Sequence, residues 1–226
     1  MADPFALTLK FMDVDLKGRA GWILLGLMTI LGLYFWSKRP PKRSPLQLAD
    51  EGHGPLIYRK YWLDFQSQDR DARDIFEAIK QDVPAFCPSL LADFKKIRGK
   101  EQVLKVGDEY DIRIFGPWNG RVRVVEVQET SFTLATLRPH PEAGQIVFEL
   151  EKLDEAFRFS ISSQARSRDA LVHLAYSFLG GNKVQEKAWQ TFCERVAEEG
   201  GGETLGTFQS ETIEVPSSPV KAGEVA

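Results

Sequence analysis

Hydrophobic residues occur in one long uninterrupted segment near the N-terminus and in many short, regularly spaced segments after it. The long segment covers residues 20–36 and contains no charged side chain. As a helix it would extend about 25 Å, slightly less than the roughly 30 Å hydrocarbon core of a bilayer. Trp22 lies near one end and Tyr34-Phe35-Trp36 at the other, and such rings favour the membrane interface. This pattern predicts a single transmembrane helix over residues 20–37.

A buried core helix and a cleaved signal peptide are alternative explanations of such a segment. A core helix has a polar face unless it is fully enclosed, and residues 20–36 show none. A signal peptide ends in small residues, whereas this segment ends in Tyr-Phe-Trp and continues with basic residues and prolines. Four basic residues follow it before Asp50, against three ahead of it. The positive-inside rule then favours a single-pass membrane protein with its soluble domain in the cytoplasm.

The rest of the sequence divides into four parts around this segment. Residues 1–19 are mixed in charge, and residues 38–55 form a linker rich in proline and basic residues. The soluble domain is expected over residues 56–199. After it the sequence is rich in Ser, Thr, Glu and Gly, so we expect residues 200–226 to be disordered.

Within the soluble domain, short segments with a hydrophobic period of two predict strands. The even spacing of these segments and the turn residues between them indicate an antiparallel meander. The expected strands are 56–65, 95–104, 107–115, 121–128, 131–137, 144–150 and 156–165.

Helical spacing interrupts this series after the first strand. Asp69 or Asp71 is a candidate N-cap for a helix whose apolar face contains Ile75, Phe76 and Ile79. A second short helix is expected through residues 90–94.

The C-terminal part of the domain is helical, over residues 169–179 and 182–199, with Gly180-Gly181 between the two segments. A single curved antiparallel sheet would have one exposed concave face, and the final helix would cover it. The predicted fold class is therefore α+β, a helix-grip fold preceded by one transmembrane helix. A cavity between sheet and helix is typical of this arrangement.

Composition narrows the classes of partner and cofactor. The formal net charge is −3, so no basic excess indicates nucleic-acid binding. Cys87 and Cys193 are the only cysteines, and they form neither a disulfide framework nor a metal spacing. We expect two half-buried free thiols. The three histidines share no spacing that would unite them in a metal site, and no cofactor motif is present.

Several short motifs between residues 106 and 196 occur together in a known family. The most specific is His-Pro-Glu-x-Gly, residues 140–144, after a strand that ends in Thr136-Leu137. The others are Val106-Gly107, Gly116-Pro117-Trp118, the strand 121–125, Ser167-Arg168, Leu179-Gly180-Gly181 and Gln185. In these residues the chain resembles the bacterial and plant family called domain of unknown function nineteen-ninety, which is similar to START-like and polyketide-cyclase-like proteins. The resemblance implies a START-like helix-grip fold and no particular activity.

His140 and Glu142 are the candidate catalytic residues, because a histidine beside a carboxylate suits general acid–base chemistry. Both lie in a loop with Pro139 and Pro141. The alternative is structural: the prolines shape a tight connection, and His140 or Glu142 hydrogen-bonds the loop backbone. The sequence has no recognisable Ser or Cys nucleophile, phosphate-binding loop or metal pair.

Polar residues on the inner sheet face and on the covering helix are candidates for ligand binding, since ligand pockets are mostly apolar with a few convergent polar groups. His173 can equally be a residue at the core boundary, and Trp189 can be core or ligand contact. The predicted ligand-binding residues are Trp118, Arg138, His140, Arg166, His173 and Tyr176.

Three functions remain open. The first is a non-enzymatic, membrane-anchored module that binds an apolar or amphipathic, lipid-like ligand. The second is an accessory or assembly subunit that docks on a membrane protein complex, and the third is a hydrolase or cyclase that uses His140 and Glu142. An empty cavity of roughly several hundred Å³ would favour the first function. A cavity filled by Phe and Trp side chains would favour the second, and a close His140–carboxylate pair facing an open cleft the third.

Overall fold

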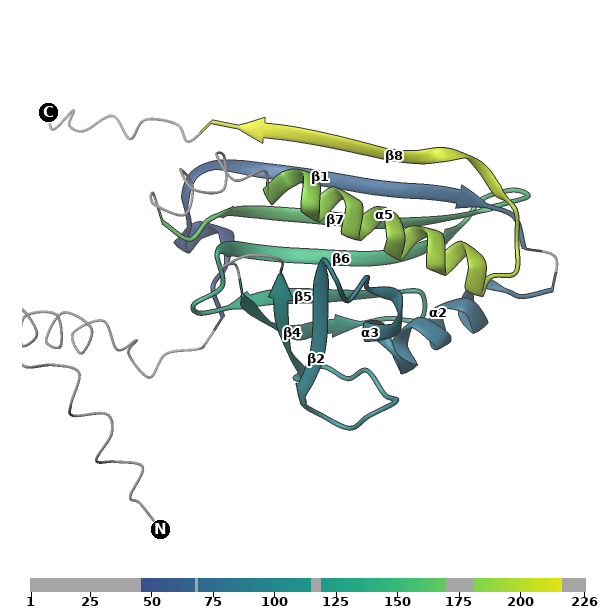
Figure 1. Cartoon of the computed structure of the whole chain (residues 1–226), viewed down its shortest axis with the longest axis horizontal. Helices are drawn as coiled ribbons and strands as arrows, with labels where there is room; N and C mark the ends of the chain where they lie inside the picture. Colours follow the sequence, from purple (N-terminus) through teal and green to yellow (C-terminus); the bar gives the residue numbers. More distant parts are fainter. Residues whose placement is uncertain (1–45, 68, 115–118, 170–180, 217–226) are drawn as a thin grey trace, which may run out of the picture. The chain divides into compact units, whose positions relative to one another are not determined.

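An antiparallel sheet of eight strands forms the centre of the computed structural model (Figure 1). The structure describes residues 46–67, 69–114, 119–169 and 181–216. The predicted membrane helix at 20–37 lies outside these described residues. Of the helices within the described ranges, none combines the length and apolar character needed to cross a bilayer.

The strands follow one another across the sheet in nearly sequential order. Their order is β2-β3-β4-β5-β6-β7-β1-β8, with every neighbouring pair antiparallel. The bounds are β1 (His53–Phe65), β2 (Ala92–Arg98), β3 (Glu109–Ile114), β4 (Gly120–Val127), β5 (Ser131–Leu137), β6 (Glu142–Lys152), β7 (Phe157–Ser167) and β8 (Thr204–Val215). The predicted meander is thus present from β2 to β7.

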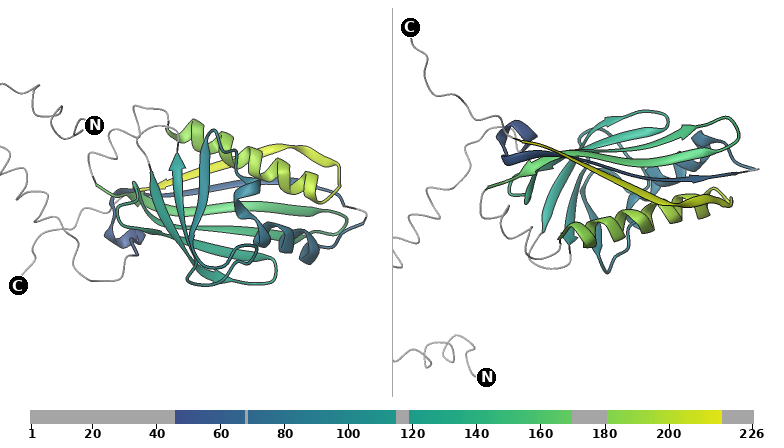
Figure 2. Two further views of the ribbon diagram at one scale, coloured as in Figure 1. Left: turned by 60° about the horizontal axis from the view of Figure 1, so that its bottom comes forward. Right: turned by 90° about the horizontal axis from the view of Figure 1, so that it is seen from above.

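Helices cover one face of this sheet. The long helix α5 (Gly181–Glu199) runs along β1 and β7 (Figures 1 and 2). Two shorter helices, α2 (Ala72–Gln81) and α3 (Val83–Phe86), contact α5 near its C-terminal end. A 3-10 turn, η2 (Ala49–Glu51), precedes β1. A curved antiparallel sheet covered by a C-terminal helix is the predicted helix-grip arrangement.

Local sequence explains why these elements form. In β7 the alternate residues Phe157, Phe159 and Ile161 are buried beneath α5, as the period of two predicts. Asp71 caps α2 by accepting a hydrogen bond from the backbone nitrogen of Asp74 at 2.8 Å. The apolar face of that helix is fully buried.

The prediction of a short helix at residues 90–94 is wrong. Residues from Ala92 onward form β2, which pairs with β3 through Ala92 and Ile114. Ala92 and Phe94 are buried with Asp93 between them, so a period of two fits these residues as well as helical spacing does. The hydrogen bonds available from β3 decide in favour of the strand. The short helix lies earlier, at α3.

The expected boundaries of the domain also require correction. Residues 204–215 of the expected disordered tail form β8, which pairs with β1 along its length. Most of its side chains are exposed, so backbone pairing holds this strand in place rather than burial. Phe208 does reach the core and stacks on Tyr61 at 6.1 Å. At the other end, Gln47 of the expected linker is buried, and residues 217–226 lie outside the described residues.

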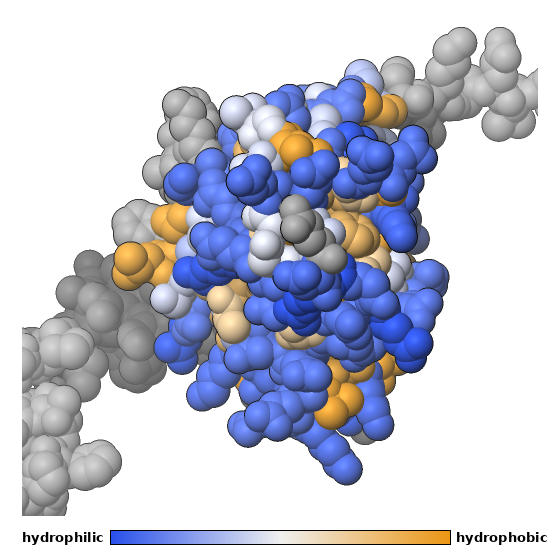
Figure 3. Space-filling view, turned by 90° about the vertical axis from the view of Figure 1, so that its right-hand side faces the viewer, coloured by the Kyte–Doolittle hydropathy of each residue, from blue (hydrophilic) through white to orange (hydrophobic). Residues whose placement is uncertain are grey.

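The core is rich in aromatic side chains at the middle of α5. Trp189 and Phe192 both pack on Phe148 of β6, at centroid distances of 5.7 and 5.2 Å. Cys87 and Cys193 are free thiols, as expected, but both are fully buried rather than half-buried. Figure 3 shows that the outer surface at the α2 end of the domain is mostly hydrophilic, with small separate hydrophobic areas.

Candidate functional site

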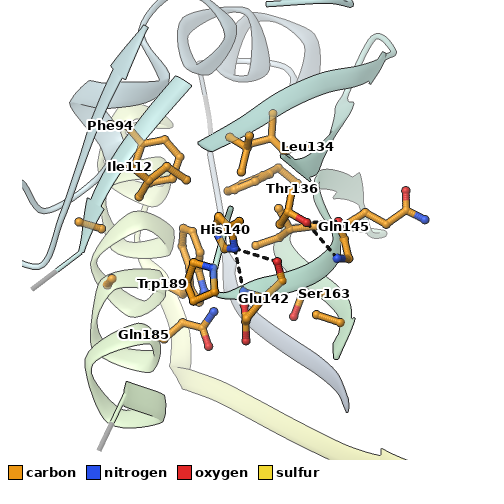
Figure 4. Close-up of a pocket in the computed structure, with 18 of the residues that line it drawn as sticks. Phe94, Ile112, Leu134, Thr136, His140, Glu142, Gln145, Ser163, Gln185 and Trp189 are labelled. Carbon is orange, nitrogen blue, oxygen red and sulfur yellow. Dashed lines mark hydrogen bonds between the residues drawn. The ribbon is translucent and has the colours of Figure 1, made fainter. Parts of the chain in front are cut away.

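A cavity of about 80 Å³ lies between the inner face of the sheet and the N-terminal half of α5. Strands β2 to β7 form its floor and walls, and Gln185, Ala188 and Trp189 of α5 form its cover (Figure 4). Most of the lining is apolar. The principal apolar residues that line the cavity are Phe94, Ile112, Val122, Leu134, Ile146 and Phe148.

Three polar atoms in the wall of this cavity have no hydrogen-bond partner within the part of the chain that the structure describes. They are Ser163 Oγ of β7, Gln185 Oε1 and Trp189 Nε1 of α5; we call them the polar trio. The side chain of Trp189 is buried, with a residue exposure of 8%. Leaving a buried polar group unpaired costs about 1–3 kcal/mol. An occupant of the cavity that pairs with these atoms would remove that cost.

His140 lies in the cavity wall at the connection between β5 and β6. It is buried, and its Nδ1 lies 3.0 Å from both the backbone nitrogen and the carbonyl oxygen of Glu142. That carbonyl already accepts a hydrogen bond from Gln47 Nε2 at 2.9 Å. The arrangement therefore favours the tautomer in which Nδ1 accepts from the Glu142 N–H and Nε2 carries the proton.

Burial lowers the pKa of His140 below its ordinary value of 6.5, and Arg168 acts in the same direction. The negative charge and the backbone hydrogen bond of Glu142 oppose this shift without reversing it. The ring is also closely packed: a Cβ added to Gly120 would lie 2.0 Å from His140 Cδ2. Glycine at position 120 therefore makes room for a neutral, tightly held imidazole.

The Glu142 side chain pairs with Arg59 rather than with His140. Arg59 Nη1 donates to Glu142 Oε1 at 2.9 Å, and the two side chains are 4% and 17% exposed. Among the described contacts, His140 meets Glu142 only through the backbone of that residue. The loop also receives a hydrogen bond from Gln47 Nε2 to the His140 carbonyl at 2.9 Å. This geometry agrees with the structural alternative, in which His140 holds the loop.

The other predicted ligand-binding residues do not gather at the cavity. Arg138 is exposed and pairs with Glu51 at 2.9 Å. Arg166 donates to the carbonyl of Gly54. Neither residue lines the cavity. Trp118, His173 and Tyr176 lie outside the described residues.

Sequence reasoning missed Ser163 and Gln185 and left Trp189 undecided between core and ligand contact. A signal for Ser163 was present, because it continues the inward-facing series of Phe157, Phe159 and Ile161 on β7. Gln185 lies one helical turn before Trp189, on the same side of α5. A polar residue in an otherwise buried series marks such positions.

Metal and thiol chemistry find little support in the described residues. No group of three or more His, Cys, Asp or Glu side chains in these ranges is arranged to hold a metal ion. Burial raises the pKa of both thiols, Cys87 and Cys193, well above their ordinary value. Both therefore remain protonated and poorly nucleophilic at neutral pH.

Comparison with known proteins gives one family match and several structural similarities. The family model described as Domain of unknown function (DUF1990) matches residues 66–195, more than half of the chain. No curated protein matches the sequence.

Solved structures with similar folds include the di-domain ARO/CYC protein StfQ from the steffimycin biosynthetic pathway. The identity is 13% and the TM-score 0.48, over 65% of this chain and 51% of StfQ, so this chain spans about half the length of StfQ. A conserved protein from Geobacillus kaustophilus has 11% identity and a TM-score of 0.44, over 66% and 99% of the two chains. Norcoclaurine synthase from Thalictrum flavum has 10% identity and a TM-score of 0.44, over 66% and 90%. These similarities concern the fold alone.

Proposed function

Because the chain belongs to the DUF1990 family, whose description names no activity, we propose its function from the cavity: the domain is a helix-grip module that binds a small apolar or amphipathic molecule beneath α5. The observation that carries this proposal is the polar trio in an apolar wall. Ligand pockets combine a mostly apolar lining with a few polar groups that orient the ligand. Ser163, Gln185 and Trp189 have this character.

The size of the cavity limits the ligand. Sites for drug-sized molecules measure about 300–1,000 Å³, whereas this cavity measures about 80 Å³. The ligand in our proposal is therefore a molecule of a few heavy atoms, or the end of a longer chain that enters between α5 and the sheet.

Membrane attachment is part of the same proposal and rests on the sequence. The predicted helix at residues 20–37 would anchor the chain in the bilayer, with the domain on the cytoplasmic side. Apolar and amphipathic molecules are concentrated there, and a short tether raises the effective concentration of the domain near them. Fractionation of cells that express the full-length chain, with carbonate and detergent washes, tests this attachment.

A second function is favoured by a different observation. Phe132, Phe148 and Phe192 fill much of the space beneath α5, with Phe132 stacked on Phe148 at 4.6 Å. A filled scaffold of this kind suits an accessory or assembly subunit of a membrane protein complex. A hydrolase or cyclase mechanism has less support, because Glu142 is paired with Arg59 instead of facing His140.

Native mass spectrometry of the full-length chain, purified in mild detergent, tests the first function against the second. We expect a small molecule to remain bound and to be lost from the variant with both Gln185→Leu and Trp189→Phe. The control is Ser160→Ala, which changes a buried serine of β7 outside the cavity lining. A chain without bound small molecules that co-purifies stoichiometrically with membrane proteins would favour the accessory subunit.

A further inference from the structure

We propose that the cavity selects a neutral hydroxyl group as the polar end of its ligand, an inference that rests on the proposed binding function. It follows from the hydrogen-bonding capacity of the polar trio, from the charges around the cavity and from its size. Each of these excludes a different class of ligand.

The polar trio requires a group that both accepts and donates hydrogen bonds. The indole Nε1–H of Trp189 can only donate, and the amide oxygen Oε1 of Gln185 can only accept. The hydroxyl of Ser163 can do either. An ether or ketone oxygen would pair with Trp189 and leave Gln185 unpaired, and an ammonium group would do the reverse. A hydroxyl is the smallest neutral group that can both accept from an N–H and donate to a carbonyl oxygen, which suits a cavity of about 80 Å³.

The charges around the cavity disfavour an ionic head group. No Lys or Arg is among the residues described as lining it, and its one carboxylate, Glu142, already pairs with Arg59 at 2.9 Å. His140 is the remaining titratable side chain of the wall, and burial holds it neutral. A carboxylate or phosphate would lose its hydration without gaining a cation, which is costly in an apolar site. An ammonium ion would have to compete with Arg59 for Glu142.

The indole N–H signal of Trp189 in NMR spectra of the full-length chain, labelled with ¹⁵N at tryptophan, reports directly on this site. Trp189→Phe identifies the signal among the five tryptophans of the chain. The probes are 1-butanol, methyl propyl ether, butanoate and butylammonium, which share a similar size and differ in the polar group. We expect 1-butanol to shift the signal in a saturable way, with an affinity about 10-fold higher than that of either ion and about 3-fold higher than that of the ether.

Matched variants connect this affinity to the polar trio. Ser163→Ala and Gln185→Met should each weaken 1-butanol binding by about 3- to 10-fold, whereas Ser160→Ala on the same strand should leave it unchanged. Equal or tighter binding of butanoate or butylammonium would overturn the hydroxyl inference and leave the proposed binding function in place. If no probe shifts the Trp189 signal and native mass spectrometry finds no bound molecule, the polar trio holds only water, and both proposals fail.

Discussion

The two halves of α5 pack on the same sheet and yet have opposite surroundings. In the C-terminal half, Phe192, Cys193 and Val196 are completely buried, and the ring of Phe192 stacks on Phe159 at 5.5 Å with an interplanar angle of 5°. We call this the closed half. In the N-terminal half, Gln185 and Trp189 border a cavity and carry buried polar atoms without a partner in the described part of the chain. We call this half of α5, together with the residues that line the cavity beneath it, the open half. One helix thus provides both a stabilising core and a candidate binding site.

The difference arises from the elements beside each half. Helices α2 and α3 pack against the closed half and complete its enclosure. Arg195 of α5 donates to the carbonyls of Ala85 and Cys87 at 2.9 and 2.7 Å, which fixes α3 to the helix. The open half faces β2 to β7, with no residue of α2 or α3 among those that line its cavity. Among the described residues, the cavity therefore lies beside the half of α5 that α2 and α3 do not line.

The largest expected effect separates the two halves by their packing. Phe192→Ala should lower the free energy of unfolding by about 3–5 kcal/mol, because the close packing of the closed half leaves a void that neighbours cannot fill. Phe94→Ala in the open half should cost less, since its side chain borders a cavity already. Urea denaturation of both variants measures the difference. An equal or larger loss for Phe94→Ala would contradict the distinction between the halves.

A smaller effect is expected from the ion pair at the edge of the open half. Glu142→Gln keeps the shape of the side chain but removes the charged acceptor of the buried Arg59 Nη1 hydrogen bond, which should cost about 2 kcal/mol. Glu51→Gln is the matched control, because its partner Arg138 is exposed, and it should cost less than about 1 kcal/mol. The same denaturation experiment decides, and similar losses for the two variants would show that the Arg59 pair is weak.

The open half should also make stability depend on pH. Burial lowers the pKa of His140 below 6.5 in the folded chain, so the unfolded chain takes up a proton at a higher pH. Titration of His140 therefore does not reduce the free energy of unfolding above about pH 6.5. Below that pH it lowers the free energy of unfolding, by at most about 1.4 kcal/mol per pH unit. Denaturation at pH 7.5, 6.5 and 5.5 should give a shallower decrease for His140→Gln than for the natural chain. Parallel decreases would mean that other groups cause the dependence.

The smallest effect distinguishes unpartnered from partnered hydroxyls in the same cavity. Ser163→Ala removes a buried oxygen without a hydrogen bond, so the free energy of unfolding of the ligand-free chain should stay the same or rise by up to about 1 kcal/mol. Thr136→Val removes a hydroxyl that donates to the Gln47 carbonyl at 2.6 Å and accepts from Gly144 N at 3.1 Å. It should cost about 1–2 kcal/mol. A clear loss of stability for Ser163→Ala would show that its hydroxyl has a partner after all.

Much of the fold could be predicted from the sequence, because strands such as β4 and β7 carry buried hydrophobic residues at alternate positions, for example Val122 and Val124 in β4. The two errors concern segments where pairing decides the structure. Residues 90–94 fit a helix as well as a strand, and β8 has the composition of a disordered tail. Its pairing with β1 joins residues more than 130 positions apart, as with Tyr61 and Ser210, and local composition contains no information on such a partner.

The candidate site could be predicted only in part. His140 and Glu142 stood out because a specific motif contains them, and both do line the cavity. Arg138 and Arg166 are predicted as polar residues on the inner sheet face, but their side chains bond to Glu51 and to the Gly54 carbonyl instead. The polar trio is identified by side-chain atoms that have no hydrogen-bond partner in the described part of the chain. Whether an atom has a partner depends on all its neighbours in space, which the sequence alone does not give.

The turn between α5 and β8 has a mechanical consequence. A Cβ on Gly202 would lie 1.2 Å from the carbonyl oxygen of Gln66, and Ser67 Oγ donates to the carbonyl of Gly200 at 2.7 Å. The helix is thus fastened at its C-terminal end, and β8 continues from that point along the edge of the sheet. Entry of a ligand beneath α5 would therefore displace the N-terminal half of the helix, beside the cavity, rather than this C-terminal end.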